Sequence, residues 1–379
     1  MAKHAFPMHS IRSGERYESD IFLGREFLLR QGHPVTPELF IRLKRRGVKE
    51  LTTPLESLAV RMRERVGALP ALHREKLAER RDALLAEAGV ESAVPHEIYD
   101  RAVAASAAAF LDAANGTLTD FSPLFNCANE LAERVKFTGG EVYKPLDTPS
   151  PDLYYTRHGV NVAVLLLSVM DGAAEEVGKA QVAMGGLLHD IGKAHVPGTI
   201  LFKQGALSED EWNAVRDHVS HSMKHLAAAI EVAPEIRGMI EGHHEKWNGT
   251  GYPAGKAGED IPALARWLTC CDVYDALTTT RAHQGRVAPP IALELLLQSA
   301  GSHFDPDVAG KISLRLGTYP VGSYLLLDVD RTALVVRNFP GDAPDRPEVV
   351  PVTFDGGEPR AGARFRISGR SEVSDIIDV

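Results

Sequence analysis

Residues 185–194 read GGLLHDIGKA and place an imidazole and a carboxylate, His189 and Asp190, side by side in an otherwise apolar stretch. Burying ionisable groups is costly unless a metal or a partner satisfies them, and a histidine–aspartate pair suits a divalent transition metal. Lys193 follows Asp190 by three residues, so both are expected on one helical face, where the ammonium can meet a phosphate. A lone HD dipeptide is more typical of an ordinary helix with a solvated polar end, so the rest of the chain must decide.

Length and composition narrow the class of protein. The 379 residues suit two or three domains, and the formal charge of −9 argues against binding to a nucleic-acid polymer, although a local basic pocket can still hold a small anion. No apolar run approaches the length of about 20 residues that spans a bilayer. The N-terminus lacks the apolar core of a signal peptide, and three cysteines make no disulfide framework. We therefore expect a cytoplasmic protein without membrane insertion.

The hydrophobic pattern divides the chain into three parts. Residues 1–95 form a small α+β unit, with strands expected near 17–23, 26–29 and 48–51, a helix from Thr36, and charged helices over 56–89 that suit regulation or dimerisation. Residues 96–316 are helical, and residues 317–379 form a short β extension with strands near 323–328, 332–337, 348–354 and 364–367. The predicted fold is therefore mainly α, a helical bundle with small α+β and β appendages.

Histidines and aspartates are concentrated in the helical part. Eight of the 15 histidines fall between His158 and His244. A helical bundle can direct side chains from successive helices at one internal point. The candidate ligands exceed what one zinc ion needs, so the economical interpretation is two metals that share Asp190. Two ions about 3.5–4 Å apart generate a hydroxide between them and clamp the oxygens of an in-line phosphoryl displacement. The candidates are His158, His189, Asp190, His218, His243, His244 and Asp272.

The order of these residues resembles the HD-GYP family. This family is a branch of the HD metal-dependent phosphohydrolases, and its members hydrolyse the bacterial second messenger cyclic di-GMP. The resemblance covers about residues 96–316 and rests on the run HDIGK at 189–193, on HHEKWNGTGYP at 243–253, and on DVYDALTTTR at 272–281. The resemblance implies a cyclic di-GMP phosphodiesterase with an HD-type bundle, forming linear pGpG, with onward cleavage to GMP left open.

The resemblance also implies roles for individual residues. One metal would be held by His158, His189, Asp190 and Asp272, and the second by Asp190, His218, His243 and His244. Asp190 and Lys193 would be the catalytic residues. Asp190 would be shared by the two metals, and Lys193 would contact the scissile phosphate. Arg281 would grip a phosphate of the ligand, and Gly251, Tyr252 and Pro253 would shape the loop beside the substrate. Iron or manganese is the family's usual metal, with nickel, zinc and cobalt as alternatives.

Several positions depart from the family pattern. Tyr154 stands where the three-metal subset has a glutamate, which favours two metals. Asn248 replaces a frequent aspartate, and His283 and Gln284 remove one expected phosphate contact. Two alternatives stay open: a phosphodiesterase of another cyclic dinucleotide or nucleotide, and a cyclic di-GMP sensing or docking module with weak activity. A homodimer, and signalling partners bound through the GYP loop or the N-terminal unit, are further expectations.

The remaining candidates have plainer interpretations. His195, His221 and His225 are expected to line the cleft or a helix face rather than to bind metal. Cys270 and Cys271 are expected to pack beside Asp272. Glu245 is a candidate for orienting His243 or His244, and Asp275 for supporting Arg281 or Lys193.

Overall fold

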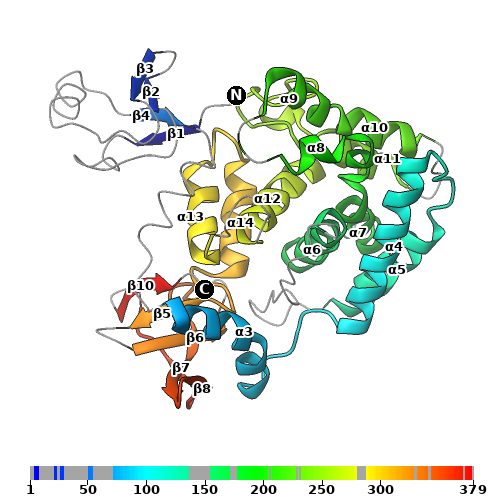
Figure 1. Ribbon diagram of the computed structural model, residues 1–379. Coiled ribbons are helices and arrows are strands. Elements are labelled where there is room, and N and C mark those ends of the chain that lie inside the picture. Colours follow the sequence, from blue (N-terminus) through cyan, green and yellow to red (C-terminus); the bar gives the residue numbers. More distant parts are fainter. Residues whose placement is uncertain are drawn as a thin grey trace.

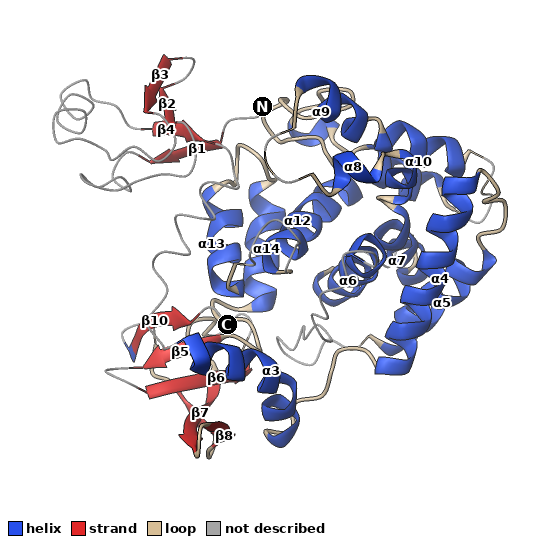
Figure 2. Ribbon diagram, in the orientation of Figure 1, coloured by secondary structure: helices blue, strands red, loops and turns tan. Residues whose placement is uncertain are grey.

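The chain is mostly helical, with a small antiparallel sheet near its C-terminus (Figure 2), so the predicted fold class is confirmed. The computed structural model describes the backbone of four N-terminal strands and residues 71–135, 154–170, 177–203, 205, 207–227, 229, 232–279, 287–327, 331–339, 343–369 and 372–377. The helix predicted from Thr36 lies outside these residues. So do residues 56–70, the first part of the charged segment predicted over 56–89.

Helix α6 (Tyr154–Val169) lies at the centre of the bundle, and its sequence is apolar on nearly every face. It packs against α4 (His96–Asn115), α7 (Lys179–Leu188) and α12 (Ala263–Thr278), and α5 (Ser122–Arg134) covers α7 (Figure 1). A Cβ on Gly186 would come within 2.6 Å of the Ala163 backbone. The glycine therefore permits the close contact between α6 and α7.

Local sequence signals lie at the starts of several other helices of the bundle. Ser208 and Glu211 form a reciprocal capping box at the start of α9 (Glu209–Arg216). Prolines occupy the first turn of α11, α13 and α14. The remaining short elements and helices are η3 (Ile191–His195), α8 (Gly198–Leu201), α10 (His218–Leu226), α11 (Pro234–Glu241), η4 (Gly258–Asp260), α13 (Pro289–Gln298) and α14 (Pro306–Leu316).

The HD segment is not a continuous α-helix. Helix α7 ends at Leu188, and η3 is a 3₁₀-helix in which the Lys193 N–H donates to the Asp190 carbonyl at 2.8 Å. A 3₁₀-helix has three residues per turn, so residues three apart eclipse each other. Lys193 consequently lies directly beside Asp190, and its Nζ is 2.5 Å from Asp190 Oδ2.

The C-terminal sheet has the strand order β10-β5-β6-β7-β8, and β9 also pairs with β7. Four of its strands lie where the alternation predicts them: β5 (Tyr324–Leu327), β6 (Arg331–Arg337), β7 (Glu348–Asp355) and β9 (Phe365–Arg366). The sequence did not indicate β8 (Glu358–Ala361) or β10 (Val373–Ile377). The alternation in β8 is weak, and β10 pairs antiparallel to β5, nearly fifty residues earlier.

Helix α3 (Ala71–Glu87) belongs with the C-terminal sheet. Leu77, Leu84 and Leu85 share one hydrophobic core with strands β5, β6 and β7, and the Tyr324 hydroxyl donates to the Leu77 carbonyl at 3.0 Å. Figure 1 shows α3 lying against this sheet. The division at residues 95 and 316 remains a proposal, and this shared core assigns α3 to the β extension rather than to the N-terminal strands.

Near the N-terminus, β1 (His4–Pro7), β2 (Ile21–Leu23), β3 (Glu26–Leu29) and β4 (Glu50–Thr53) form an antiparallel sheet in the order β1-β4-β2-β3. The strand expected over 48–51 lies two residues later, where Leu51 pairs with Phe6. Strand β1 was not predicted from the sequence.

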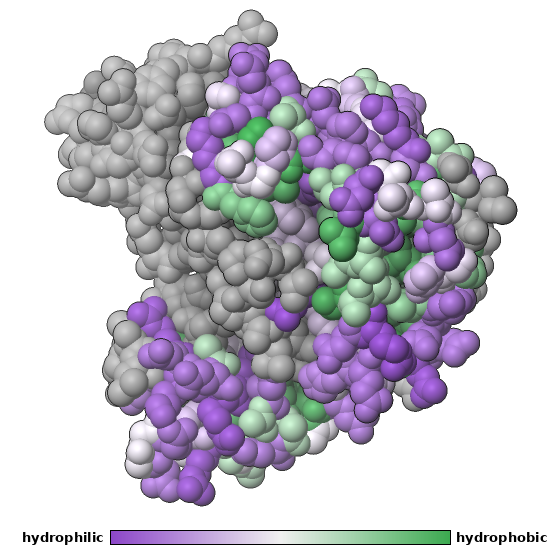
Figure 3. All heavy atoms as spheres, turned by 45° about the vertical axis from the view of Figure 1, so that its right-hand side comes forward, coloured by the Kyte–Doolittle hydropathy of each residue, from purple (hydrophilic) through white to green (hydrophobic). Residues whose placement is uncertain are grey.

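Hydrophobic residues on the face drawn in Figure 3 are interspersed with hydrophilic ones. Among the described helices, none combines the length and the apolar character needed to cross a bilayer.

Candidate metal centre

The structure brings all seven predicted ligands into one cluster. His158 comes from α6, His189 and Asp190 follow α7, His218 begins α10, His243 and His244 lie in the turn after α11, and Asp272 comes from α12. Most of these side chains are fully buried. Helix α7 ends at Leu188 and α11 ends at Glu241. The short segments that follow these two helix ends carry the paired ligands, His189 with Asp190 and His243 with His244.

Backbone carbonyls hold three of the imidazoles by their outer nitrogen. Nδ1 of His189 lies 2.8 Å from the Gly186 oxygen, that of His218 lies 2.5 Å from the Val215 oxygen, and that of His243 lies 2.6 Å from the Ile240 oxygen. A carbonyl oxygen only accepts, so each Nδ1 carries the proton and donates it. Each Nε2 is left with a lone pair directed into the cluster, which is the form that binds a metal.

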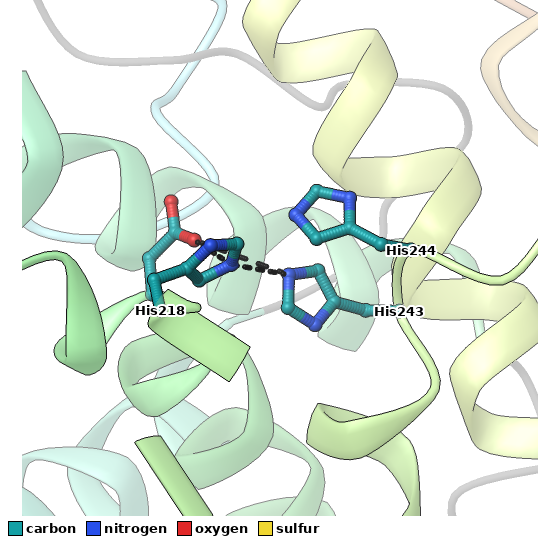
Figure 4. Close-up of side chains that lie close together, drawn as sticks. His218, His243 and His244 are labelled. Carbon is teal, nitrogen blue, oxygen red and sulfur yellow. Dashed lines mark hydrogen bonds and ion pairs between the residues drawn. The ribbon is translucent and has the colours of Figure 1, made fainter. Parts of the chain in front are cut away.

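Asp190 lies among these inward nitrogens. Its Oδ1 is 3.4 Å from Nε2 of His218, and its Oδ2 is 3.4 Å from Nε2 of His189. Figure 4 shows the rings of His218, His243 and His244 turned toward one another, with 3.5 Å between Nε2 of His218 and Nε2 of His243. The two oxygens of one carboxylate therefore face two groups of histidines.

The protonation states of Asp190, His218 and His243 favour binding of a cation. Burial alone would raise the pKa of Asp190, but Lys193 and His189 hold it well below its usual value. Burial lowers the pKa of His218 to about 4 and, with the nearby His189, that of His243 to about 3. At neutral pH Asp190 is therefore ionised and the imidazoles of His218 and His243 are neutral, the protonation states that a metal requires of these ligands.

Orphaned polar atoms indicate that the cluster fits metal ions. Among the described residues, His189 Nε2, Asp190 Oδ1 and His244 Nε2 are buried without a hydrogen-bond partner, and buried polar groups are normally paired. The ligand atoms converge in three overlapping groups, each within 4.8 Å: Asp190, His218, His243 and His244; His158, His189 and Asp190; and His189, His243 and Asp272. A metal would satisfy the orphaned atoms.

Asp275 has a role that sequence reasoning assigned differently. Its Oδ2 lies 2.7 Å from His158 Nδ1, while His158 Nε2 lies 2.9 Å from Asp272 Oδ1. Burial opposes protonation of His158, but the bonds to these two carboxylates outweigh it and raise the pKa of the imidazole. The described contacts thus assign Asp275 to orienting His158. The i, i+3 spacing of the two aspartates on one helix face was the available signal.

Replacing Asp275 should weaken metal binding without removing a ligand. We expect Asp275→Asn to lower affinity for Mn²⁺ by about 10–100-fold, the usual effect of losing a carboxylate behind a metal-binding histidine. Titration calorimetry of the metal-depleted protein measures this. Asp307→Asn, at an exposed carboxylate on α14, is the matched control, and equal affinity in both variants would contradict the assignment.

The GYP loop folds back on the cluster. The Tyr252 ring stacks on the His244 ring with 4.7 Å between centroids, and the backbone N–H of Tyr252 donates to the His244 carbonyl at 3.1 Å. A Cβ on Gly251 would lie 2.4 Å from the Lys246 nitrogen, so this position requires glycine. Pro253 follows on the exposed side. Glu245 is buried and accepts the Ala254 N–H at 2.7 Å, so its described contact is to this loop rather than to either histidine.

The other predicted positions have simple outcomes. Arg281, His283 and Gln284 lie outside the described residues. The Tyr154 ring stacks on His158 with 5.7 Å between centroids, and Asn248 accepts from the N–H and hydroxyl of Thr250. Cys270 and Cys271 are buried in the core, where burial raises the pKa of both thiols.

Comparison with known proteins agrees with this geometry. A family model described as HD domain matches residues 164–308. A cyclic di-GMP phosphodiesterase of Pseudomonas aeruginosa is 32% identical over 260 residues, which cover 66% of this chain and 61% of that protein. A probable cyclic di-GMP phosphodiesterase of Vibrio cholerae is 41% identical over 128 residues, 32% of this chain and 29% of its own length. A 3'3'-cGAMP-specific phosphodiesterase of the same organism is 32% identical over 178 residues, 47% of this chain and 38% of its own length.

The bundle, the histidine–aspartate cluster and the family match define an HD-domain protein. The order of the HD and GYP motifs, together with these relatives, makes the chain similar to the HD-GYP family. The chain spans less than two thirds of the length of each of these relatives.

Proposed function

We propose that this protein is a metal-dependent phosphodiesterase that hydrolyses cyclic di-GMP to linear pGpG. The observation that carries the proposal is the convergence of six histidine and aspartate side chains, most of them buried, on the buried carboxylate of Asp190. Their chemistry fits two divalent ions, iron or manganese, that share this carboxylate. His158, His189 and Asp272 would complete one metal site, and His218, His243 and His244 the other.

Bound divalent ions supply a water nucleophile at neutral pH and neutralise charge on phosphate oxygens. The protein's own residues contribute the rest. Burial opposes a charged Lys193, but Asp190 outweighs it and raises the pKa of the amine. Lys193 therefore stays an ammonium, part-buried beside the cluster, where it would bind an equatorial oxygen of the scissile phosphate as negative charge builds there.

Two further groups border the proposed substrate site. The Tyr252 phenol has its pKa raised by burial and by Asp190, so it remains a neutral hydrogen-bond donor. The Arg216 guanidinium lies over the same ring at 5.6 Å and is exposed. Together with the proposed phosphate contact of Arg281, this gives the acidic protein a local cationic site for a dinucleotide. Partner docking through the GYP loop or the N-terminal unit, dimerisation and a cytoplasmic location remain predictions.

The similarity to a 3'3'-cGAMP-specific enzyme makes another cyclic dinucleotide the second candidate substrate. The test is turnover of cyclic di-GMP and 3'3'-cGAMP, side by side, by protein purified anaerobically with its metal content counted. Linear pGpG with about two metals per chain supports the proposal. Preference for 3'3'-cGAMP selects the second substrate. Binding without turnover, after loading with iron and with manganese, would overturn both and leave a sensing module.

A further inference from the structure

A second group of histidines lies outside the cluster of seven ligands around Asp190, which we call the central cluster. His195 ends η3, and His221 and His225 lie one turn apart on α10. Nε2 of His195 is 2.8 Å from Nε2 of His225. The His195 ring also lies 4.7 Å from that of His221 and 5.0 Å from that of His225, centroid to centroid. His195 is thus flanked by both helix histidines, and we call these three residues the outer triad.

The outer triad differs from the central cluster in exposure. His195 is exposed and the other two are half-buried, whereas His189, His218 and His243 have no solvent-exposed surface. Among the described residues, the sets of three or more ligand atoms within 4.8 Å all lie in the central cluster. In the outer triad, Nε2 of His195 and Nε2 of His225 already lie close together, and the His221 imidazole lies beside the His195 ring.

We propose that the outer triad is a surface binding site for a divalent transition-metal ion. Imidazole nitrogens bind such ions at about 2.1 Å. Two nitrogens 2.8 Å apart at that distance subtend an angle of about 84° at the ion. This angle suits neighbouring ligands in square-planar or octahedral geometry, which Cu²⁺ and Ni²⁺ prefer, rather than the tetrahedral geometry of Zn²⁺.

The surroundings keep the ligands in the metal-binding form. Burial, followed by the nearby His195, lowers the pKa of His221 and of His225. Both imidazoles are therefore neutral at pH 7, with lone pairs available to an ion. The i, i+4 spacing of His221 and His225 places both on one face of α10, the face that packs against η3.

An ion at the outer triad would join two elements that serve the central cluster. Lys193 lies two residues before His195 on η3, and α10 begins at His218. Occupancy would cross-link η3 to α10 and stabilise their contact, because a ligand that binds only the folded protein raises its stability. This inference does not depend on which substrate the central site takes.

The test uses full-length protein produced without an affinity tag and bound to immobilised Ni²⁺. A resin-held ion reaches only surface imidazoles, so the buried central cluster does not contribute. We expect His195→Gln and His225→Gln to elute at lower imidazole than wild type, with His221→Gln intermediate. The exposed His96 at the start of α4 provides the matched control, and His96→Gln should elute with wild type.

A solution measurement completes the test. With the central site loaded with Mn²⁺, Ni²⁺ titration should show a further site whose dissociation constant rises at least about tenfold in His225→Gln, since losing a ligand costs at least as much as losing a supporting contact. Unchanged melting temperatures without Ni²⁺ would exclude misfolding as the cause. If the pair only shares a hydrogen bond, all variants bind Ni²⁺ as wild type does, and the proposal is overturned.

Discussion

Replacing Asp190 by asparagine should abolish both metal retention and hydrolysis. The substitution keeps the shape of the side chain but removes the charge that faces His189 on one oxygen and His218 on the other. We expect kcat to fall by about a thousandfold or more, which corresponds to about 4 kcal/mol of transition-state free energy. Metal counting by mass spectrometry on the same sample separates loss of ions from loss of chemistry.

The asparagine variant also leaves the Lys193 ammonium without its ion-pair partner at 2.5 Å. A part-buried cation without its partner is destabilising, so thermal unfolding should be followed in parallel. Asp307→Asn removes an exposed carboxylate whose side chain is 71% accessible, and it should match wild type in every assay. An Asp190→Asn protein that keeps its metals and its rate would refute the central role of this carboxylate.

Gly192→Ala should be the most damaging single change to the fold around the site. The added Cβ would lie 2.0 Å from the His218 carbonyl oxygen and 2.5 Å from the Ser222 nitrogen. Both neighbours are backbone atoms, so η3 and α10 must separate. Overpacking of this kind costs about 3 kcal/mol, and the melting temperature should fall by roughly 5–10 °C. Separation would also move His218, so metal content should drop.

Gly310→Ala on α14 is the control for this experiment. A Cβ at that position meets nothing within 4 Å. Alanine in a helix interior is favoured over glycine by about 0.5–1 kcal/mol, so this variant should melt at the wild-type temperature or slightly above it. Equal melting temperatures for Gly192→Ala and Gly310→Ala would show that η3 and α10 tolerate more space than their packing indicates.

Local signals predicted most of the fold. The capping box at Ser208 and the proline at residue 306 lie at the starts of α9 and α14, and signals of this kind can be recognised in a sequence because they act through the next few residues alone. The order of the HD, GYP and Asp272 motifs likewise named a set of side chains that the structure gathers into one cluster.

Features that depend on distant residues were not predictable in the same way. The contact between Asp275 and His158 spans 117 residues, and periodicity cannot indicate which residue an aspartate meets. The pairing of His195 with His225 arises because η3 turns back on α10. Strand β10 is an edge partner of β5, and its short alternation alone does not distinguish it from a turn.

The shared core of α3 and the C-terminal sheet has a consequence for folding order. Leu77 and Tyr324 are joined by a hydrogen bond across 247 positions, so α3 leaves the ribosome long before its partner strands are synthesised. Its buried leucines must stay uncovered while the whole bundle forms between them, and contacts between distant segments form slowly. The two ends of this small β unit can therefore close only after translation of the bundle, and until then the buried leucines of α3 remain accessible to chaperones and proteases.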